Sequence, residues 1–248
     1  MFETFKIWQH QGKQFIPDVT KATLTEIFRG RPEISTESVN EAEVAELCPT
    51  SAILTNPMRI DLGRCTFCGE CELAYPKKIK FTNDHKIAAN TREALIVKEG
   101  DTSPIKIDAN AVRKEIKSFF GNSLKLRQVS AGGDSANEWE LGACSNVNFD
   151  MSRFGIDFVA SPRQADGIVI TGAISTNMAE ALQITYDAMP FPKLIILVGT
   201  EAISGGIFEG SPAIDRSFLD KYKVDLYVPG NPIHPLTFIN GILTMIAK

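Results

Sequence analysis

Residues 65–71 read Cys-Thr-Phe-Cys-Gly-Glu-Cys and place three thiols on one short loop. A fourth thiol, Cys48, is followed by Pro49, so four of the five cysteines lie within 24 residues of one another. Residues 1–30 contain no signal-peptide core, and the thiols of a cytoplasmic protein stay reduced, so a disulfide framework is not expected. The clustered thiols therefore indicate a metal centre.

The spacing of these thiols favours a [4Fe–4S] cluster over zinc. Three cysteines at positions i, i+3 and i+6 hold three corners of a cubane cluster, and a Cys-Pro elsewhere in the chain supplies the fourth thiolate. A zinc site made of four cysteines usually pairs two C-x₂-C segments, so zinc is the less favoured alternative. We predict one [4Fe–4S] cluster, with these ligands: Cys48, Cys65, Cys68 and Cys71.

The ligands of a second cluster are absent from this segment. Two-cluster ferredoxins carry two complete sets of cysteines, each set completed by the Cys-Pro of the other motif. Counting back from Cys48 and forward from Cys71 by the same spacing reaches residues that do not bind clusters: Ser38, Glu41, Val44 and Tyr75. One complete set of ligands survives and the other is wholly lost, which predicts a single cluster.

Residues 60–65 read Ile-Asp-Leu-Gly-Arg-Cys and lead directly into the cysteine loop. With the Cys-Pro at residues 48–49, this segment resembles the second cluster motif of bacterial ferredoxin domains. The resemblance implies an α+β ferredoxin-like domain over residues 31–97, preceded by an N-terminal extension over residues 1–30.

A second domain is predicted over residues 107–248, after a charged linker at residues 98–106 that contains glycine and proline. Short apolar runs alternate with helical patterns there, which predicts a parallel sheet covered by helices on both faces. Asp108 is the expected N-cap of the first helix and Gly121 its stop. The expected strands are residues 124–129, 156–159, 167–171, 194–199 and 224–228, and the expected helices are residues 108–120, 177–189 and 236–247.

Charge and hydropathy exclude several classes of function. The 248 residues have a net charge of −4, and lysine and arginine are scattered, so nucleic acid is not an expected partner. No apolar run approaches the roughly 18 residues of a membrane span. The glycine-rich residues 199–210 lack the spacing of a nucleotide-binding loop, and no Ser/His/Asp constellation occurs. We expect a cytoplasmic chain that does not catalyse a reaction by itself.

Six sequence blocks follow one another between residues 153 and 230. They are Arg-Phe-Gly at 153–155, Ala-Ser-Pro-Arg-Gln-Ala-Asp at 160–166, Thr-Gly-Ala at 171–173, Tyr-Asp at 186–187, Ser-Gly-Gly-Ile-Phe at 204–208 and Val-Asp-Leu-Tyr-Val-Pro-Gly at 224–230. In this order they resemble the small, cluster-bearing subunit shared by [NiFe]-hydrogenases and complex I, above all its membrane-bound, formate-hydrogenlyase type. The resemblance implies a doubly wound, flavodoxin-like α/β domain, whose loops at the carboxyl ends of the strands carry function.

The four cluster ligands that this resemblance implies are all replaced. An ungapped match of residues 132–141 puts the first two ligand positions on Asp134 and Asn137; the third falls on Glu201 and the fourth on Asn231. An iron–sulfur cube needs thiolates or, occasionally, imidazole, so we expect no cluster at this replaced-ligand site. The remaining thiol, Cys144, falls on no ligand position and is interpreted as a buried thiol rather than a substitute ligand.

Two interpretations of the replaced-ligand site stay open. The four side chains could bond to one another and to water, and we prefer this interpretation. Two carboxylates and two amides are also an oxygen-donor set for Ca²⁺ or Mg²⁺. In either case Asp134 and Glu201 would repel each other if close, which would raise the pKa of one of them. Two nearby residues have simpler roles, since His234 is expected to cap a helix or lie at the surface and Trp139 to pack at a subunit seam.

These features predict an iron–sulfur electron-transfer subunit of a hydrogenase-like or complex-I-like oxidoreductase, with a relay that ends at the N-terminal cluster. A scaffold or redox-sensing subunit is the alternative. The resemblance implies a partner like the hydrogenase large subunit or the 49-kDa subunit of complex I, together with membrane subunits. It also implies a peripheral position on the cytoplasmic face of the inner membrane.

Overall fold

Five short apolar runs form one parallel sheet in the C-terminal half of the chain. The computed structural model describes residues 2–12, 14–112, 114–120 and 123–246. Its sheet has the order β10-β9-β8-β6-β7 and consists of β6 (Leu124–Ser130), β7 (Ile156–Phe158), β8 (Gly167–Thr171), β9 (Leu194–Val198) and β10 (Leu226–Val228). All neighbouring strands are parallel, which confirms the predicted sheet.

The strand order fixes where loops gather. Counted along the chain it is 2-1-3-4-5, the flavodoxin-like order, and its direction reverses between β6 and β8. Every residue of β8 and β9 is buried, because helices cover both faces of a parallel sheet and leave no polar side. A crevice for ligands is expected at the carboxyl ends of β6 and β8.

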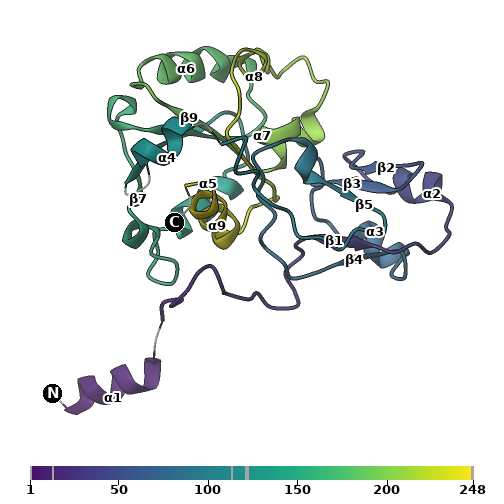
Figure 1. The fold of residues 1–248 in the computed structure, drawn as a ribbon, viewed down its shortest axis with the longest axis horizontal. Coiled ribbons are helices and arrows are strands. Elements are labelled where there is room, and N and C mark those ends of the chain that lie inside the picture. The colour runs from purple at the N-terminus through teal and green to yellow at the C-terminus, as the bar shows by residue number, and fades with distance from the viewer. Residues whose placement is uncertain (1, 13, 113, 121–122, 247–248) are drawn as a thin grey trace.

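Two layers of helices enclose the sheet (Figure 1). On one face lie α6 (Thr176–Asp187) and α8 (Ser217–Lys221), and their buried residues join one apolar core. The other face is covered by α4 (Lys114–Phe120), α5 (Ala136–Ala143) and α9 (Pro235–Met245), which share a second core. The short α7 (Thr200–Ser204) follows β9 at the carboxyl edge.

The N-terminal half forms a smaller lobe of two antiparallel sheets and two short helices (Figure 1). Its elements are β1 (Pro32–Ile34) paired with β4 (Ile79–Phe81), the three-stranded sheet of β2 (Ile53–Leu54), β3 (Arg59–Asp61) and β5 (Ile96–Lys98), and the helices α2 (Glu41–Glu46) and α3 (Glu70–Ala74). Its buried residues belong to the same core as α6 and α8, so the two lobes pack directly on each other.

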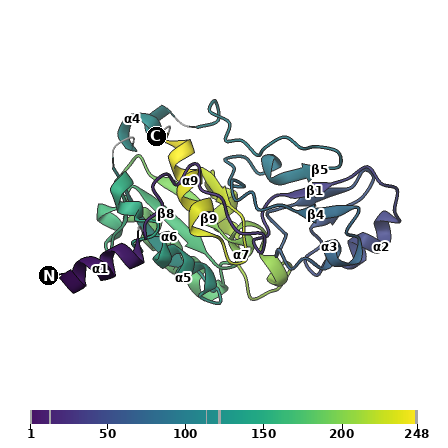
Figure 2. The same cartoon turned by 90° about the horizontal axis from the view of Figure 1, so that it is seen from below.

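The N-terminal extension crosses the C-terminal lobe beside α9 (Figure 2). Val19 is buried, and its carbonyl accepts a 2.9 Å hydrogen bond from Asn240 Nδ2. The amide of Ile16 donates to the carbonyl of Asn148 at 2.9 Å. The preceding helix, α1 (Phe2–Gln11), has no buried residue and projects from the body. The extension is therefore a strap fixed to the C-terminal lobe.

One predicted helix is wrong at its start. The pattern predicts a helix over residues 108–120, yet α4 begins at Lys114, and the predicted stop at Gly121 lies outside the described residues. Asp108 is not its N-cap, because Asp108 Oδ1 accepts from the amide of Asn110 at 2.8 Å in a separate turn. The predicted linker over residues 98–106 overlaps β5, because Lys98 is the last residue of that strand.

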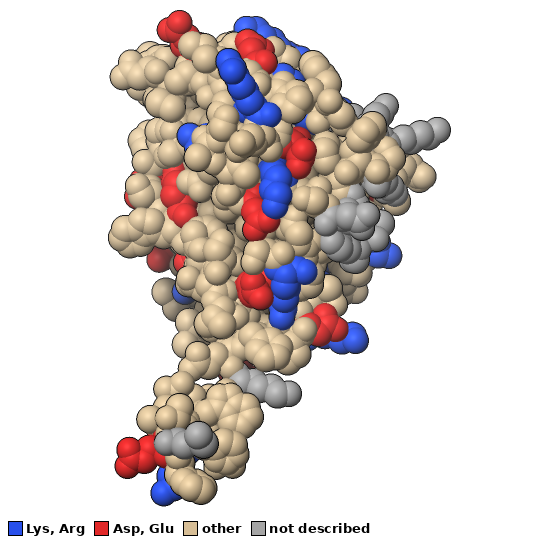
Figure 3. Space-filling view, turned by 90° about the vertical axis from the view of Figure 1, so that its left-hand side faces the viewer, with Lys and Arg blue, Asp and Glu red and all other residues tan. Residues whose placement is uncertain are grey.

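The surface carries both charges side by side. On the face that Figure 3 shows, acidic and basic side chains alternate instead of forming a basic patch. Within the described ranges, no helix combines the length and the apolar character needed to cross a membrane.

Candidate iron–sulfur centre and the replaced-ligand site

The structure gathers the four predicted cluster ligands around one largely enclosed cavity. Cys48 lies in the turn that follows α2, where its amide donates to the carbonyl of Ala45 at 3.1 Å. The cysteine loop (residues 65–71) lies after β3 and contributes the other three thiols; its last residue, Cys71, lies in the first turn of α3. Apolar side chains, including Ile53, Ile60 and Phe81, complete the lining. Two segments that are separate in sequence thus present their thiols to a common space.

The cysteine loop curls because two of its residues adopt left-handed backbone conformations. Phe67 has a φ of 55° and Gly69 a φ of 84°. Gly69 precedes α3, and a β-carbon there would lie 2.7 Å from Arg29 Nε of the strap. Glycine satisfies both demands, since it tolerates positive φ and leaves room for the arginine.

Backbone amides and burial set the electrostatics of the thiols. The amide of Ala52 donates to Cys48 Sγ at 3.2 Å, and the amide of Phe67 donates to Cys65 Sγ at 3.3 Å. Burial raises the pKa of Cys65, and it raises the pKa of Cys71 to about 11, with the neighbouring thiols adding to both shifts. Metal binding must therefore displace protons, and the amide donors favour the thiolate form that a metal requires.

The donor set fits a cluster better than a single ion. Among the residues that the structure describes, no group of three or more His, Cys, Asp and Glu side chains is positioned to hold a metal ion, so the comparison rests on the chemistry of the four thiols. A cubane cluster spreads its four thiolates over four iron atoms, whereas zinc draws four ligands onto one ion. The four cysteines that line this cavity would supply the four thiolates that a cubane cluster needs. Cys68 is exposed, so one side of this centre faces solvent.

A hydrogen bond ties the cysteine loop to the C-terminal lobe. The hydroxyl of the buried Thr200 donates to the carbonyl of Cys65 at 2.7 Å. The amide of Thr200 donates to the carbonyl of Gly230 at 3.0 Å, next to Asn231. An ion pair between Arg64 and Glu209 joins the same two lobes. Sequence reasoning missed Thr200, because no local pattern marks a hydroxyl that bonds a residue far away in the chain.

Three loops of the replaced-ligand site meet at the carboxyl ends of the parallel strands. Asn137, at the start of α5, accepts a 3.0 Å hydrogen bond at Oδ1 from the amide of Ile233, two residues after Asn231. A β-carbon at Gly199 would lie 2.4 Å from Asn137 Nδ2, so the loop after β9 touches α5 as well. The loops after β6, β9 and β10 therefore come together at the carboxyl ends of the strands.

The four side chains of this site are not equally buried. Asp134 is exposed and accepts from the amide of Ala136 at 2.9 Å, and Asn231 is half-buried. Asn137 and Glu201 are buried. Among the described residues, no hydrogen bond joins these four side chains to one another; Asn137 bonds a backbone amide instead.

A second glutamate, which no sequence pattern singled out, belongs to this site. Glu138 Oε1 accepts hydrogen bonds from the hydroxyls of Ser130 at 2.5 Å and Thr171 at 2.6 Å. Burial raises the pKa of Glu201, and the charges of Asp134 and Glu138 raise it further. The position of Glu138 beside Asn137 in the ungapped match was the signal that could have identified it.

Two predicted roles outside the sites are confirmed. Cys144 is fully buried, its Sγ donates to the carbonyl of Glu140 at 3.3 Å, and burial raises its pKa to about 12. His234 caps α9, because its Nδ1 accepts from the amide of Leu236 at 3.1 Å. Trp139 is 80% exposed on α5, and its packing at a subunit seam stays a prediction.

Comparison with known proteins finds one family model and several similar proteins. The family model described as NADH ubiquinone oxidoreductase, 20 Kd subunit, matches residues 135–245. An NADH-quinone oxidoreductase subunit of Heliobacterium modesticaldum is 44% identical over 147 residues, which are 57% of this chain and 82% of that protein. A probable membrane-bound hydrogenase subunit of Pyrococcus furiosus is 30% identical over 130 residues, 52% of this chain and 78% of that protein.

A solved structure is also similar. One chain of the membrane-bound sulfane sulfur reductase, an archaeal respiratory membrane complex, is 30% identical with a TM-score of 0.46; the match covers 53% of this chain and 73% of that chain.

Proposed function

Because this chain belongs to the family of the 20-kDa subunit of NADH:ubiquinone oxidoreductase, we propose that it is the iron–sulfur electron-transfer subunit of a complex-I-like or hydrogenase-like membrane complex. Family membership makes it a subunit of an oxidoreductase of this kind. The proposal adds that its redox centre is a single [4Fe–4S] cluster in a ferredoxin-type domain over residues 31–97. The ligands are Cys48, Cys65, Cys68 and Cys71.

One observation carries this proposal: four thiols from two separate segments line one cavity, and backbone amides donate to two of them. Such a cluster supplies one-electron transfer, at a potential set by burial and by hydrogen bonds to its sulfur ligands. Ile53, Ile60 and Phe81 exclude water on the inner side of the cavity, while exposed Cys68 leaves a short path to a redox partner.

The replaced-ligand site has no thiolate or imidazole among its four positions, so it does not fit a second cluster. In this proposal the electrons enter and leave through the N-terminal cluster. The C-terminal domain, residues 107–248, then serves to dock a partner that resembles the large subunit of hydrogenase or the 49-kDa subunit of complex I. Exposed Trp139 and Ile207 near this site would lie in such an interface.

The membrane subunits of the same complex would hold the chain at the cytoplasmic face of the inner membrane. The relative from Pyrococcus furiosus is named a probable membrane-bound hydrogenase subunit, which supports association with a membrane complex. The loss of all four ligands in the C-terminal domain favours one second candidate, a scaffold subunit whose cluster is structural or senses redox state.

Iron analysis and redox titration test the proposal. Anaerobically purified protein should contain about four iron and four sulfide per chain, given one set of four cysteine ligands. Cys68→Ala should abolish the cluster, and the matched variant Cys144→Ala should leave the iron content unchanged because Cys144 does not line the cavity. Stoichiometric zinc would contradict the proposal, and about eight iron would contradict the single-cluster assignment.

Two further results separate the candidates. A cluster that is reversibly reduced and reoxidised supports electron transfer, whereas one that resists reduction supports the scaffold. Detergent-solubilised membranes should yield the chain together with a large-subunit-like protein and membrane subunits. Recovery as a free monomer alone would contradict the complex.

A further inference from the structure

The side chain of Arg29, near the end of the strap, lies on the cysteine loop. Its Nη1 donates to the carbonyl of Phe67 at 3.3 Å. A β-carbon at Gly69 would lie 2.7 Å from Arg29 Nε and 3.1 Å from its Cζ, so the guanidinium group packs directly on the backbone of the loop. Phe67 and Gly69 flank Cys68, the exposed thiol of the proposed cluster. A cation therefore lies where the centre faces solvent.

Both lobes hold the backbone next to Arg29. The amide of Gly30 donates to the carbonyl of Thr82 at 2.7 Å, directly after β4 of the N-terminal lobe. The ring of Phe28 packs edge-on against the ring of His234 in the C-terminal lobe, with 5.4 Å between their centroids. Because the residues before and after it are fixed, Arg29 leaves the strap at a defined point beside the cysteine loop.

No carboxylate neutralises the charge of Arg29. In the described part of the chain, Arg29 takes part in no ion pair. It lines an open groove together with Cys68, Glu70 and Glu72, yet neither glutamate forms an ion pair with it. Glu72 Oε1 accepts from the amide of Phe81 at 3.1 Å instead. The guanidinium group thus carries an unpaired positive charge in the groove that contains Cys68.

A positive charge at this point favours the reduced cluster. One-electron reduction adds one negative charge to the cluster and its thiolates, and a nearby cation stabilises that charge. A guanidinium group carries a fixed charge, so its effect needs no proton. Water and salt in the open groove weaken the attraction. We therefore expect the charge to raise the ratio of reduced to oxidised cluster by about twofold to tenfold at a fixed potential.

A purely structural role for Arg29 is the competing explanation. Its hydrogen bond to Phe67 is longer than a typical N–H···O bond, so it holds the loop only weakly. The loop is also held by the amide of Phe67, which donates to Cys65 Sγ, and by the hydroxyl of Thr200, which donates to the carbonyl of Cys65. Attraction between charges falls slowly with distance and does not need ideal hydrogen-bond geometry. These observations favour the charge over the hydrogen bond.

We infer that Arg29 tunes the reduction potential of the proposed cluster: the strap places its charge beside Cys68, where it favours the entry of one electron from an external reductant. Arg29 is not a ligand, and it neither gains nor loses an atom or an electron. The strap, which contains no cysteine, would thus contribute to electron transfer. The effect on the potential rests on the proposed function, whereas the contact between strap and loop does not.

Redox titration of the anaerobically purified full chain tests the charge. Arg29→Gln should lower the midpoint potential by up to about 59 mV, which is a tenfold change for one electron, and Arg29→Lys should restore most of it. Glu70→Gln removes a negative charge from the same groove and should shift the potential in the opposite direction. An unchanged potential in Arg29→Gln, or an equal shift in Arg29→Lys, would overturn the inference. Loss of iron from both Arg29 variants would overturn it in favour of a structural contact.

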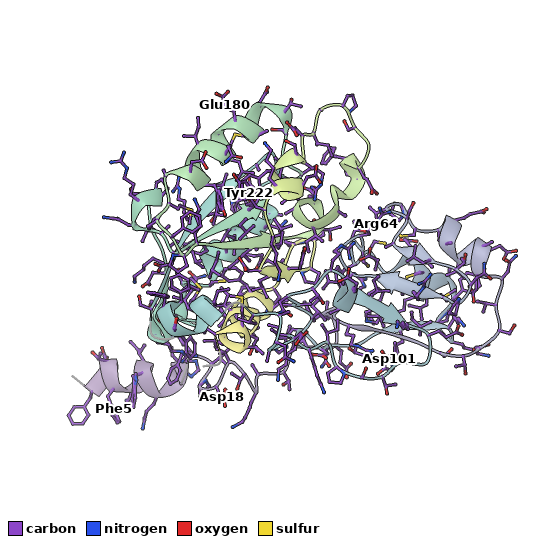
Figure 4. All side chains as sticks on the ribbon, turned by 45° about the horizontal axis from the view of Figure 1, so that its top comes forward. Phe5, Asp18, Arg64, Asp101, Glu180 and Tyr222 are labelled. Carbon is purple, nitrogen blue, oxygen red and sulfur yellow. The ribbon has the colours of Figure 1, made fainter. Side chains whose placement is uncertain are left out.

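Lys21→Gln is the matched control, because it removes another exposed cation of the strap. Lys21 pairs with Asp18 at 3.2 Å. Asp18 lies beside the C-terminal lobe, far from Arg64, the residue that leads into the cysteine loop (Figure 4). The potential of Lys21→Gln should therefore equal that of the native protein. A shift as large as that of Arg29→Gln would show a general effect of net charge and would overturn a specific role for Arg29.

Hydrogen exchange of the full chain as purified tests the contact without reference to a cluster. Amide exchange at residues 67–71 should rise in Arg29→Gln and stay at the native rate in Lys21→Gln, because only the first change removes a contact with the loop. Unchanged exchange in Arg29→Gln would overturn the contact. Protein that binds no iron would refute the proposed function, while hydrogen exchange would still decide whether Arg29 holds the strap to the loop.

Discussion

The hydroxyl of Thr200 lies 2.7 Å from the carbonyl oxygen of Cys65, to which it donates a buried hydrogen bond. Thr200 begins α7 in the C-terminal lobe, and Cys65 begins the cysteine loop of the N-terminal lobe. The same hydroxyl lies 3.4 Å from the carbonyl of Gly230, so one side chain connects three segments. The geometry of the cysteine loop therefore depends on the fold of the other lobe.

Removing the Thr200 hydroxyl should destabilise the seam between the lobes. Thr200→Val keeps the shape of the side chain but leaves the carbonyl of Cys65 without its donor, which costs about 1–3 kcal/mol of unfolding free energy. Thr200→Ser retains the hydroxyl and should keep more of that stability. Urea unfolding measures the difference, and redox titration should show a shifted midpoint potential in the valine variant alone. Equal behaviour of the two variants would contradict a role for the hydrogen bond.

Substitution of Gly172 should disrupt the crevice between β6 and β8. Gly172 has a φ of 77°, and a β-carbon there would lie 2.4 Å from the amide nitrogen of Gly133. Gly172→Ala should therefore cost about 3 kcal/mol through backbone strain and overpacking. Gly142→Ala is the matched control, because a β-carbon at this position in α5 meets nothing within 4 Å, and it should stabilise by about 0.5–1 kcal/mol. Thermal unfolding that ranked the variants the other way would contradict the packing described.

The stability of the protein should fall in mild acid because of His234. Burial is the main cause that lowers the pKa of His234 from 6.5 to about 4, and the neighbouring His85 adds to it. The unfolded chain then binds the proton more tightly, so this contribution is complete above pH 6.5 and is lost as the pH falls toward 4. We expect the free energy of unfolding to fall by on the order of 2 kcal/mol. This is less than the full pKa shift of His234 implies, because its ring is partly exposed to solvent.

Chemical denaturation at several pH values measures this loss. His234→Asn should reduce the acid sensitivity while keeping a side chain that can cap α9. His10→Asn, on the exposed α1, should leave it unchanged. An unaltered pH profile in His234→Asn would assign the acid sensitivity to other groups.

Loss of Arg216 should loosen α7. Its guanidinium donates to the carbonyls of Ala173, Glu201, Ala202 and Ile203, at distances from 2.8 to 3.3 Å. Arg216→Ala leaves these acceptors without a donor and should cost about 3 kcal/mol or more. Arg216→Lys should recover only part of this stability, because an ammonium group cannot reproduce the planar, forked set of donors of a guanidinium group. Hydrogen exchange at residues 200–204 should rise in the alanine variant, and unchanged exchange would contradict this role.

The sequence by itself determined the local elements. Apolar runs such as residues 167–171 identified buried strands, because a strand covered on both faces excludes polar residues along its length. The spacing of Cys65, Cys68 and Cys71 showed that these three thiols lie close together, because residues a few positions apart in sequence are also close in space. Where tertiary contacts compete with a local pattern the prediction failed, as at Asp108, whose backbone bonds the side chain of Asn90 and which does not cap α4.

Only the tertiary structure decided which distant residues meet. The order of the strands placed the loop of Glu138 beside that of Glu201, and it set the hydroxyl of Thr200 against Cys65. No sequence pattern predicts these pairs. The two residues of each pair lie far apart in the chain, and the helix or loop of each residue forms without the other. Packing of the two lobes on one apolar core brings Thr200 against Cys65, whereas the order of the parallel strands brings the loops of Glu138 and Glu201 together within one lobe.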